Sequence, residues 1–336
     1  MSRSKIIAPI GVLLSVVVVL AGCGLQTAGG HIPSGKLVGP IADAPDFSGV
    51  EISVGSKNFN ENIILGKMVL ILMKSAGADV TDLTNIPGSA PARQAHVEGE
   101  IDAMWEYTGT GWLQYLGQPK PILKKDPEAQ KEAQWKATRD LDLKENGLVW
   151  LPPAPMNNTY AFAITQASAK KYGITKMSEI KKLPVKERTF CVESEFKDRN
   201  DGLEGMLKAY DIPLNGRNGV PEKNLQTYQT GAIYDATDSG NCVFGEVFTT
   251  DGRILALDLQ VLEDDRKYFP SYNVSLVVRK EFYDKHPEIE DLMAPITEKL
   301  TSKELLAMNA RVDVDGESPT DVAWEWLVDN GFVEKE

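Results

Sequence analysis

The order of strand-like and helix-like segments is the feature that most constrains the fold of this chain. β-Rich runs at residues 50–54, 101–106 and 159–165 alternate with helical patterns such as residues 60–76. Alternating units of this kind predict parallel sheets covered by helices. The chain has 336 residues, which is too long for one hydrophobic core. We therefore predict an α/β fold divided into two lobes.

The N-terminal segment has the pattern of an export signal. Arg3 and Lys5 precede an apolar run at residues 6–20, which is shorter than the roughly 20 residues that span a bilayer. The letters LAGC end at Cys23 and resemble a bacterial lipobox. We predict that residues 1–22 are removed and that a lipid on Cys23 anchors the protein outside the cytoplasm, at the cell membrane. The alternative is an ordinary signal peptide or membrane anchor with a chance cysteine.

The segment that follows the lipobox is rich in Gly, Pro and Ala. Residues 23–48 show almost no hydrophobic periodicity, so we predict a flexible tether. The formal net charge of −12 argues against a nucleic-acid partner, because nucleic acids require basic patches. Two further cysteines, Cys191 and Cys242, favour one disulfide in an exported protein. Two separate buried thiols are the alternative.

Sequence patterns for catalysis are scarce. The three histidines, His31, His96 and His286, have no partners at metal-ligand spacing. The letters GTG at residues 109–111 lack the third glycine of a dinucleotide fingerprint. We therefore predict a binding protein with no metal and no cofactor rather than an enzyme.

Aromatic residues stand at the ends of the predicted strands. Tyr107 follows one strand, Tyr160 and Phe248 bound the second set of strands, and Tyr272 precedes the strand that returns to the first. Ligands of α/β sheets bind outside the carboxyl ends of the strands. Each ring alone is explained by core packing, but four rings at such positions together predict an aromatic binding site.

Six motifs, in this order, resemble the glycine betaine/choline/proline betaine-binding proteins of osmoprotectant ABC importers. They are VGSKNFNENIILGKM, GEIDAMWEYTGTGW, NNTYAFAI, ESEFKDRNDG, TTDGRI and LEDDRKYFPSYNVSLVVR. The resemblance extends from about Glu51 to Arg279 and continues more weakly through the C-terminal helices.

The resemblance implies a type II periplasmic-binding-protein fold, in which two crossovers join two α/β lobes around a cleft. The first lobe would comprise residues 49–156 and 269–336, and the second residues 157–268. Cys191 and Cys242 would then lie in the same lobe, as a disulfide requires. The implied partners are a small quaternary ammonium ligand and ABC permease subunits, and we expect a monomer without a cofactor.

The resemblance also implies which residues bind the ligand. A quaternary ammonium has no N–H group, so ring faces must replace its hydration. A betaine carboxylate needs donors, and an arginine offers a bidentate fork. The implied ring cage is Tyr107, Tyr160, Phe248 and Tyr272, and the implied carboxylate contacts are Lys57, Thr110 and Arg199.

Two departures from the family pattern affect the choice of ligand. Phe248 stands where relatives usually have Tyr, and Glu246 brings a carboxylate into the same strand. If Glu246 reaches the cleft, it favours a pure cation. Choline, carnitine and a histidine-derived betaine are therefore alternatives to glycine betaine, and an enzyme or a sensor on the same fold is a more remote one.

The stretch WEYTGTGW concentrates several of these features. We predict that Gly109 and Gly111 let the backbone approach the ligand closely. Trp105 and Trp112 are interpreted as packing beneath the site.

Overall fold

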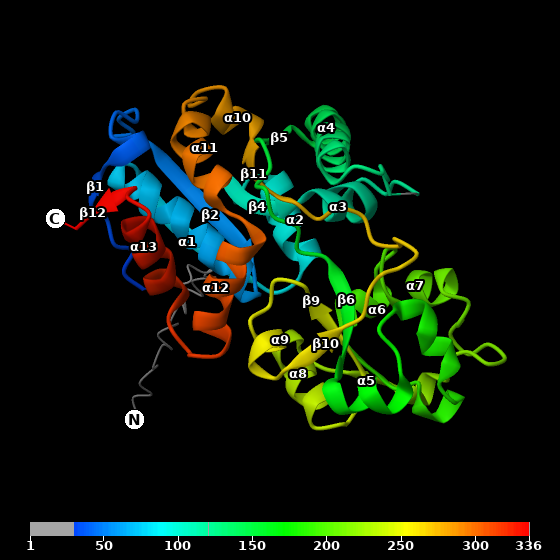
Figure 1. The fold of residues 1–336 in the computed structure, drawn as a ribbon. Coiled ribbons are helices and arrows are strands. Elements are labelled where there is room, and N and C mark those ends of the chain that lie inside the picture. The colour runs from blue at the N-terminus through cyan, green and yellow to red at the C-terminus, as the bar shows by residue number, and fades with distance from the viewer. Residues whose placement is uncertain (1–29, 120, 336) are drawn as a thin grey trace, which may run out of the picture.

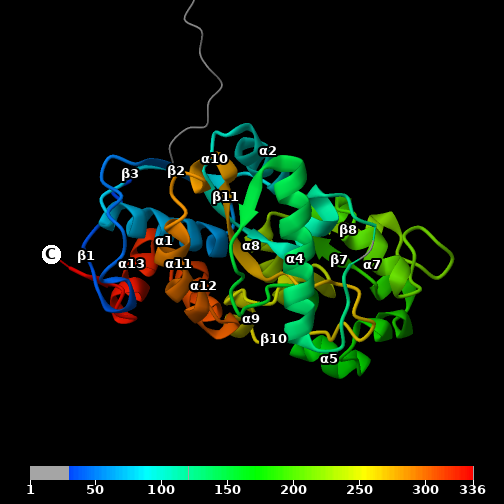
Figure 2. The same cartoon turned by 90° about the horizontal axis from the view of Figure 1, so that it is seen from above.

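The computed structural model describes residues 30–119 and 121–335, which fold into two α/β lobes (Figure 1). The sheet of the first lobe has the strand order β3-β2-β4-β11-β5, and that of the second has the order β10-β6-β9-β7-β8. Both views place α1 and α13 of the first lobe at one end and α5 and α7 of the second at the other (Figure 1, Figure 2).

The first lobe is built around a mixed sheet. β2 runs parallel to β3 and β4, whereas β11 is antiparallel to β4 and β5. Its strands are β2 (Glu51–Lys57), β3 (Asp79–Ile86), β4 (Ala103–Tyr107), β5 (Leu148–Trp150) and β11 (Val274–Arg279). Its helices are α1 (Asn60–Ser75), α2 (Ser89–Glu98), α3 (Thr108–Thr110), α4 (Pro127–Asn146), α10 (Lys280–Tyr283), α11 (Ile289–Lys299), α12 (Ser302–Asp313) and α13 (Pro319–Asp329).

Helix α1 is the centre of the first lobe. Every residue from 61 to 73 is buried, because the helix packs on β2 and β3 and is covered by α12 and α13. A helix that is apolar on most of its circumference is stable only in such an enclosed position.

The second lobe has the same plan. β6 is antiparallel to β9 and β10, and β7 is parallel to β8 and β9. Its strands are β6 (Tyr160–Thr165), β7 (Phe190–Val192), β8 (Leu225–Thr227), β9 (Phe244–Phe248) and β10 (Leu259–Val261). Its helices are α5 (Gln166–Tyr172), α6 (Ser194–Asp198), α7 (Leu203–Ala209), α8 (Thr230–Asp238) and α9 (Arg253–Ala256).

The α/β fold is confirmed, but each sheet mixes parallel with antiparallel strands where parallel sheets were predicted, and the reason is the path of the chain between the lobes. The chain crosses at residues 151–159 and returns at residues 262–273. A strand that enters a sheet from the other lobe starts at the edge where the local strands end, so β6 and β11 run antiparallel to their neighbours. The predicted lobe boundaries at 156/157 and 268/269 lie inside these two crossovers.

The prediction of a flexible tether is wrong for its later part. Strand β1 (Lys36–Leu37) pairs with the C-terminal β12 (Val333–Glu334), and Phe47 is fully buried. Glycine here serves a tight turn rather than flexibility, since Gly39 has a φ of +59° and its α-carbon faces the carbonyl of Gly331. The signal segment 1–22 and Cys23 lie outside the described residues.

Cys191 and Cys242 form a disulfide within the second lobe. Cys191 lies in β7 and Cys242 precedes β9, and their Cα atoms are 5.6 Å apart. Both cysteines are buried against Ile233 and Ala236 of α8. The bridge therefore links two neighbouring strands of the second sheet beneath the helix that packs on them.

His96 of α2 makes the stability of the first lobe dependent on pH. The side chain is fully buried, and burial, with a smaller effect of Arg93, lowers its pKa from 6.5 to about 3. The unfolded chain therefore binds a proton at a higher pH than the folded chain does. Stability that is complete above about pH 6.5 is lost as the pH falls toward 3.

We expect His96→Gln to remove most of this pH dependence. Between pH 7 and pH 5, the histidine should cost the native protein about 2 kcal/mol of unfolding free energy, which the variant does not lose. Urea denaturation at both pH values measures the difference, and His286→Gln, which changes a partly exposed histidine, is the control. The same pH dependence in native protein and His96→Gln would contradict the prediction.

Candidate ligand-binding site

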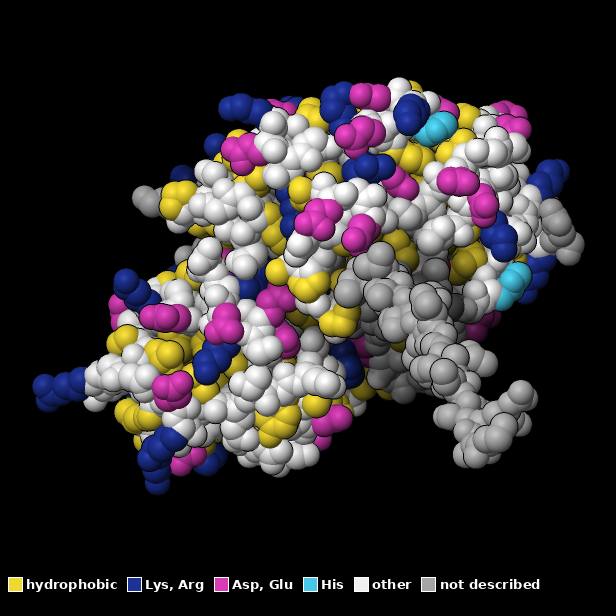
Figure 3. Space-filling model, turned by 180° about the vertical axis from the view of Figure 1, so that it is seen from behind, with side chains coloured by type: hydrophobic (Ala, Val, Ile, Leu, Met, Phe, Trp, Pro, Cys, Tyr) yellow, Lys and Arg dark blue, Asp and Glu magenta, His cyan; other side chains and the backbone are white. Residues whose placement is uncertain are grey.

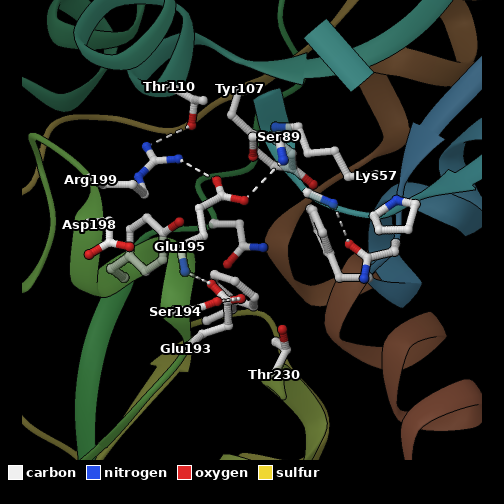
Figure 4. Close-up of a pocket in the computed structure, with 17 residues that line it drawn as sticks. Lys57, Ser89, Tyr107, Thr110, Glu193, Ser194, Glu195, Asp198, Arg199 and Thr230 are labelled. Carbon is white, nitrogen blue, oxygen red and sulfur yellow. Dashed lines mark hydrogen bonds and ion pairs between the residues drawn. The ribbon is translucent and has the colours of Figure 1, made fainter. Parts of the chain in front are cut away.

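A cavity of about 400 Å³ lies between the lobes (Figure 4). Strand ends surround it: Lys57 ends β2, Tyr107 ends β4 and Phe248 ends β9, while Tyr160 begins the antiparallel β6. The cavity is lined by Lys57, Asn58, Phe59, Pro87, Gly88, Ser89, Tyr107, Thr110, Asn158, Tyr160, Glu193, Ser194, Glu195, Asp198, Arg199, Thr230 and Phe248. All the predicted ligand-binding residues except Tyr272 are among them.

Four aromatic rings form a continuous wall of the cavity. Phe59 lies 5.8 Å from Tyr107 and 5.5 Å from Phe248, measured between ring centroids, and Phe248 lies 5.3 Å from Tyr160. The first lobe contributes Phe59 and Tyr107, and the second contributes Tyr160 and Phe248. Phe59 was not among the predicted residues, although it lies two residues after the end of β2.

Tyr272, the fourth residue of the predicted cage, is not among the residues that line the cavity. Its side chain is only 2% exposed, and its hydroxyl donates a 2.6 Å hydrogen bond to Asp201. Its ring meets Tyr160 edge-on at 5.7 Å. Tyr272 thus packs against the Tyr160 ring, which does line the cavity.

The glycines of the TGTG stretch serve protein packing. A Cβ on Gly109 would lie 2.7 Å from the Tyr272 ring, and one on Gly111 would lie 2.7 Å from the ring of Trp150. The predicted close approach therefore exists, but it is made to neighbouring aromatic side chains and not to the cavity. Trp105 is fully buried, and its Nε1 donates to the carbonyl of Leu65, as a packing role predicts.

The cationic group of Lys57 is paired within the protein. Its Nζ lies 2.7 Å from Oε2 of the fully buried Glu106 and 5.1 Å from the centroid of the Tyr107 ring. The other oxygen of Glu106 accepts a hydrogen bond from the hydroxyl of Tyr115. Lys57 therefore lines the cavity as one half of a neutral pair.

Arg199 is also engaged by carboxylates of its own lobe. Its Nε and Nη2 donate to the two oxygens of Asp201 at 2.8 and 2.7 Å, and its Nη1 donates to Glu195 at 3.2 Å. Across the cleft, Nη2 lies 3.3 Å from the Oγ1 of Thr110. The bidentate fork that was predicted for a betaine carboxylate is thus occupied by Asp201.

Three carboxylates that the sequence analysis did not single out also line the cavity. Glu195 accepts a 3.0 Å hydrogen bond from the backbone N–H of Ser89 in the other lobe (Figure 4). Glu193 caps α6, and burial raises the pKa of its carboxyl. Asp198 is the third. In an acidic chain, the sequence offers no signal that separates these residues from other acidic side chains.

Glu246 does not line the cavity. It is 3% exposed, and its Oε2 accepts a 2.7 Å hydrogen bond from the backbone N–H of Glu193. Burial raises the pKa of this carboxyl well above its usual value. Its effect on the site is therefore to hold the backbone of the Glu193 segment.

The part of the chain that the structure describes contains neither a candidate metal site nor a candidate membrane span. Within residues 30–119 and 121–335, no group of His, Cys, Asp and Glu side chains is arranged to hold a metal ion. In the same ranges, every helix is too short or too polar to cross a membrane. On the face seen in Figure 3, Lys and Arg side chains are interspersed with Asp and Glu side chains.

Two lobes, two crossovers and a ring-lined cavity at the strand ends define a periplasmic-binding-protein fold. The chain belongs to the family described as the substrate binding domain of ABC-type glycine betaine transport systems, which matches residues 50–329. It is therefore a substrate-binding protein of a transport system and not an enzyme. The fold and family expected from the six motifs are confirmed.

The relatives of this chain are named for several different ligands. The chain is 34% identical to a glycine-betaine-binding protein of Pseudomonas aeruginosa over 84% of this chain and 89% of that protein. It is 30% identical to the ergothioneine transport permease/ergothioneine binding protein EgtU of Helicobacter pylori over 82% of this chain and 46% of that protein. A crystal structure of a glycine betaine/carnitine/choline ABC transporter matches with a TM-score of 0.65 at 27% identity, covering 83% of this chain and 98% of that one.

Proposed function

We propose that the cavity binds the trimethylammonium group of glycine betaine or a related osmoprotectant, and that the protein delivers this ligand to ABC permease subunits. The observation that carries the proposal is the continuous wall of Phe59, Tyr107, Phe248 and Tyr160. Ring faces attract a quaternary ammonium, which has no N–H group to offer, and each contributes roughly 0.5–2 kcal/mol. Because each lobe supplies two rings, a bound headgroup stabilises the closed arrangement of the lobes.

The protein works outside the cytoplasm in this proposal, held to the membrane by a lipid on Cys23. The basic, apolar and lipobox segments at the N-terminus support this anchor. Membrane fractionation of cells that carry Cys23→Ser tests it, because a non-lipidated protein should leave the membrane fraction.

One observation favours a choline-like cation as a second candidate ligand. Both cations in the cavity wall, Lys57 and Arg199, are already paired with Glu106 and Asp201. Glu193, Glu195 and Asp198 add negative charge at the same wall. A zwitterionic betaine must recruit Arg199 away from its partners, whereas a choline hydroxyl donates directly to a carboxylate. A histidine-derived betaine also carries ring donors for these carboxylates.

A neutral analogue of choline tests the proposed function. We expect 3,3-dimethylbutan-1-ol, which has the shape of choline without its charge, to bind at least 30-fold more weakly, since it loses the attraction of the four ring faces. Calorimetry with choline, glycine betaine, proline betaine, carnitine and ergothioneine ranks the natural candidates in the same experiment. Equal affinity for choline and the neutral alcohol, or binding of none of the ammonium compounds, would refute the proposal.

A further inference from the structure

The carboxylate of Glu61 is a buried junction beside the cavity. Glu61 lies in the first turn of α1 and is 2% exposed. Its Oε1 accepts hydrogen bonds from the Tyr107 hydroxyl at 2.7 Å and from Asn158 Nδ2 at 2.9 Å. Its Oε2 accepts from the Thr250 hydroxyl at 2.5 Å and from Asn309 Nδ2 at 3.0 Å.

These four donors come from separate parts of the molecule. Tyr107 and Asn309 belong to the first lobe, Asn158 to the first crossover, and Thr250 to the loop that follows β9 in the second lobe. The donors are neutral groups, and the N-terminus of the 16-residue helix α1 adds a favourable dipole. A buried carboxylate is strongly destabilised when one of its hydrogen-bond donors is withdrawn. The Glu61 junction therefore favours the arrangement in which the Thr250 hydroxyl is bound.

A second set of contacts seats the same loop on the first lobe. Gly252 lies against α12, where an added Cβ would come within 2.4 Å of the Cα of Ala310. Nη2 of Arg253 is 3.3 Å from Asp313, which also accepts a 2.6 Å hydrogen bond from Asn60. The segment at residues 249–253 therefore packs directly against the first lobe in this arrangement of the lobes.

We propose that Glu61 is a positioning residue that couples lobe closure to ligand binding. Docking of Thr250 completes the set of donors on Glu61, and Glu61 in turn fixes the hydroxyl of Tyr107, whose ring is part of the cavity wall. The hydrogen bond from Tyr107 to a carboxylate also enriches the ring in electrons, which strengthens its attraction for a cation. This inference rests on the proposed function, because it assigns Tyr107 to the ligand.

Thr250→Val tests the link between the lobes without touching the cavity, since Thr250 does not line it. The change keeps the shape of the side chain and removes its hydroxyl. We expect about tenfold weaker binding of choline and glycine betaine, caused by faster dissociation with little change in association. Small-angle X-ray scattering of the ligand-free protein should show a larger open fraction. Thr297→Val, which removes a hydroxyl that bonds only within α11, should change neither.

Tyr107→Phe tests the other arm of the junction. It keeps the ring and removes the hydroxyl that donates to Glu61. If both hydroxyls act through the same carboxylate, the losses of affinity in Thr250→Val and Tyr107→Phe should be clearly less than additive in the double variant. Tyr283→Phe is the matched control, because it removes a tyrosine–glutamate hydrogen bond away from the cavity, and should combine additively with Thr250→Val.

The outcomes separate this inference from the proposed function. Native affinity and an unchanged open fraction in Thr250→Val would overturn the coupling, and so would additive losses in the double variant. If the native protein binds neither probe, the proposed function fails. The scattering of ligand-free Thr250→Val then decides the closure role of Glu61, and an unchanged open fraction overturns it.

Discussion

Tyr160→Ala should weaken binding of choline or glycine betaine by more than 100-fold, or about 2.7 kcal/mol. Tyr160 presents its ring to the cavity and also contacts Phe248 at 5.3 Å. The guanidinium carbon of Arg199 lies 5.3 Å from its centroid, and Tyr272 supports it edge-on. Truncation therefore removes a ring face and loosens its neighbours, which is typical of a binding hot spot.

Calorimetry of Tyr160→Ala and Tyr160→Phe separates the ring from the hydroxyl. The phenylalanine variant keeps the face and should bind within a few-fold of the native protein. Tyr172→Ala, at the end of α5 and outside the cavity wall, controls for the loss of a tyrosine in the same lobe. An affinity within tenfold of native for Tyr160→Ala would show that the ring wall does not hold the ligand.

Arg199→Met should destabilise the protein by about 3–5 kcal/mol, because it leaves Asp201 buried without its cation. Asp201 is 3% exposed and receives two of the arginine's donors. The variant also loses the contact of Arg199 with Thr110 across the cleft. Urea denaturation of native protein, Arg199→Met and the double variant Arg199→Met/Asp201→Asn measures the effect.

The double variant should recover most of the lost stability, since it removes the negative charge of Asp201, which the single variant leaves buried without a cation. If the natural ligand is a betaine, the double variant should still fail to bind it, while choline binding should be retained. Equal destabilisation in the single and double variants would mean that packing of the Arg199 side chain, and not its charge, supports the fold.

The family and the arrangement of two α/β lobes could be predicted because they depend on local patterns. Strand-like and helix-like runs alternate, and six short motifs occur in a fixed order. The expected place of the site followed from the same patterns, because ligands of α/β sheets bind outside the strand ends, where Tyr107 and Phe248 were expected. These predictions needed only the sequence order of the elements.

Tertiary structure alone decided which of the aromatic residues near strand ends line the cavity. Tyr272 and Phe59 both stand near strand ends, yet close packing on Gly109 and a hydrogen bond to Asp201 turn Tyr272 away, while Phe59 joins the wall. The later part of the expected tether likewise packs on the first lobe, because β1 pairs with β12, which lies about 300 residues later in the chain.

The charge of the site was the other property that the sequence could not supply. Lys57 is paired with Glu106, which lies 49 residues away in the sequence, so only the fold brings these two charges together. Asp201 is two residues from Arg199 in the sequence, but its pairing with both donor groups of the arginine, and the burial of the pair, are seen only in the folded chain. The Glu61 junction depends on contacts across 46 to 248 residues of sequence. Local patterns determined the family and the expected place of the site. The burial of the charged groups and their hydrogen-bond partners, which no local pattern encodes, decided which charges the candidate site presents.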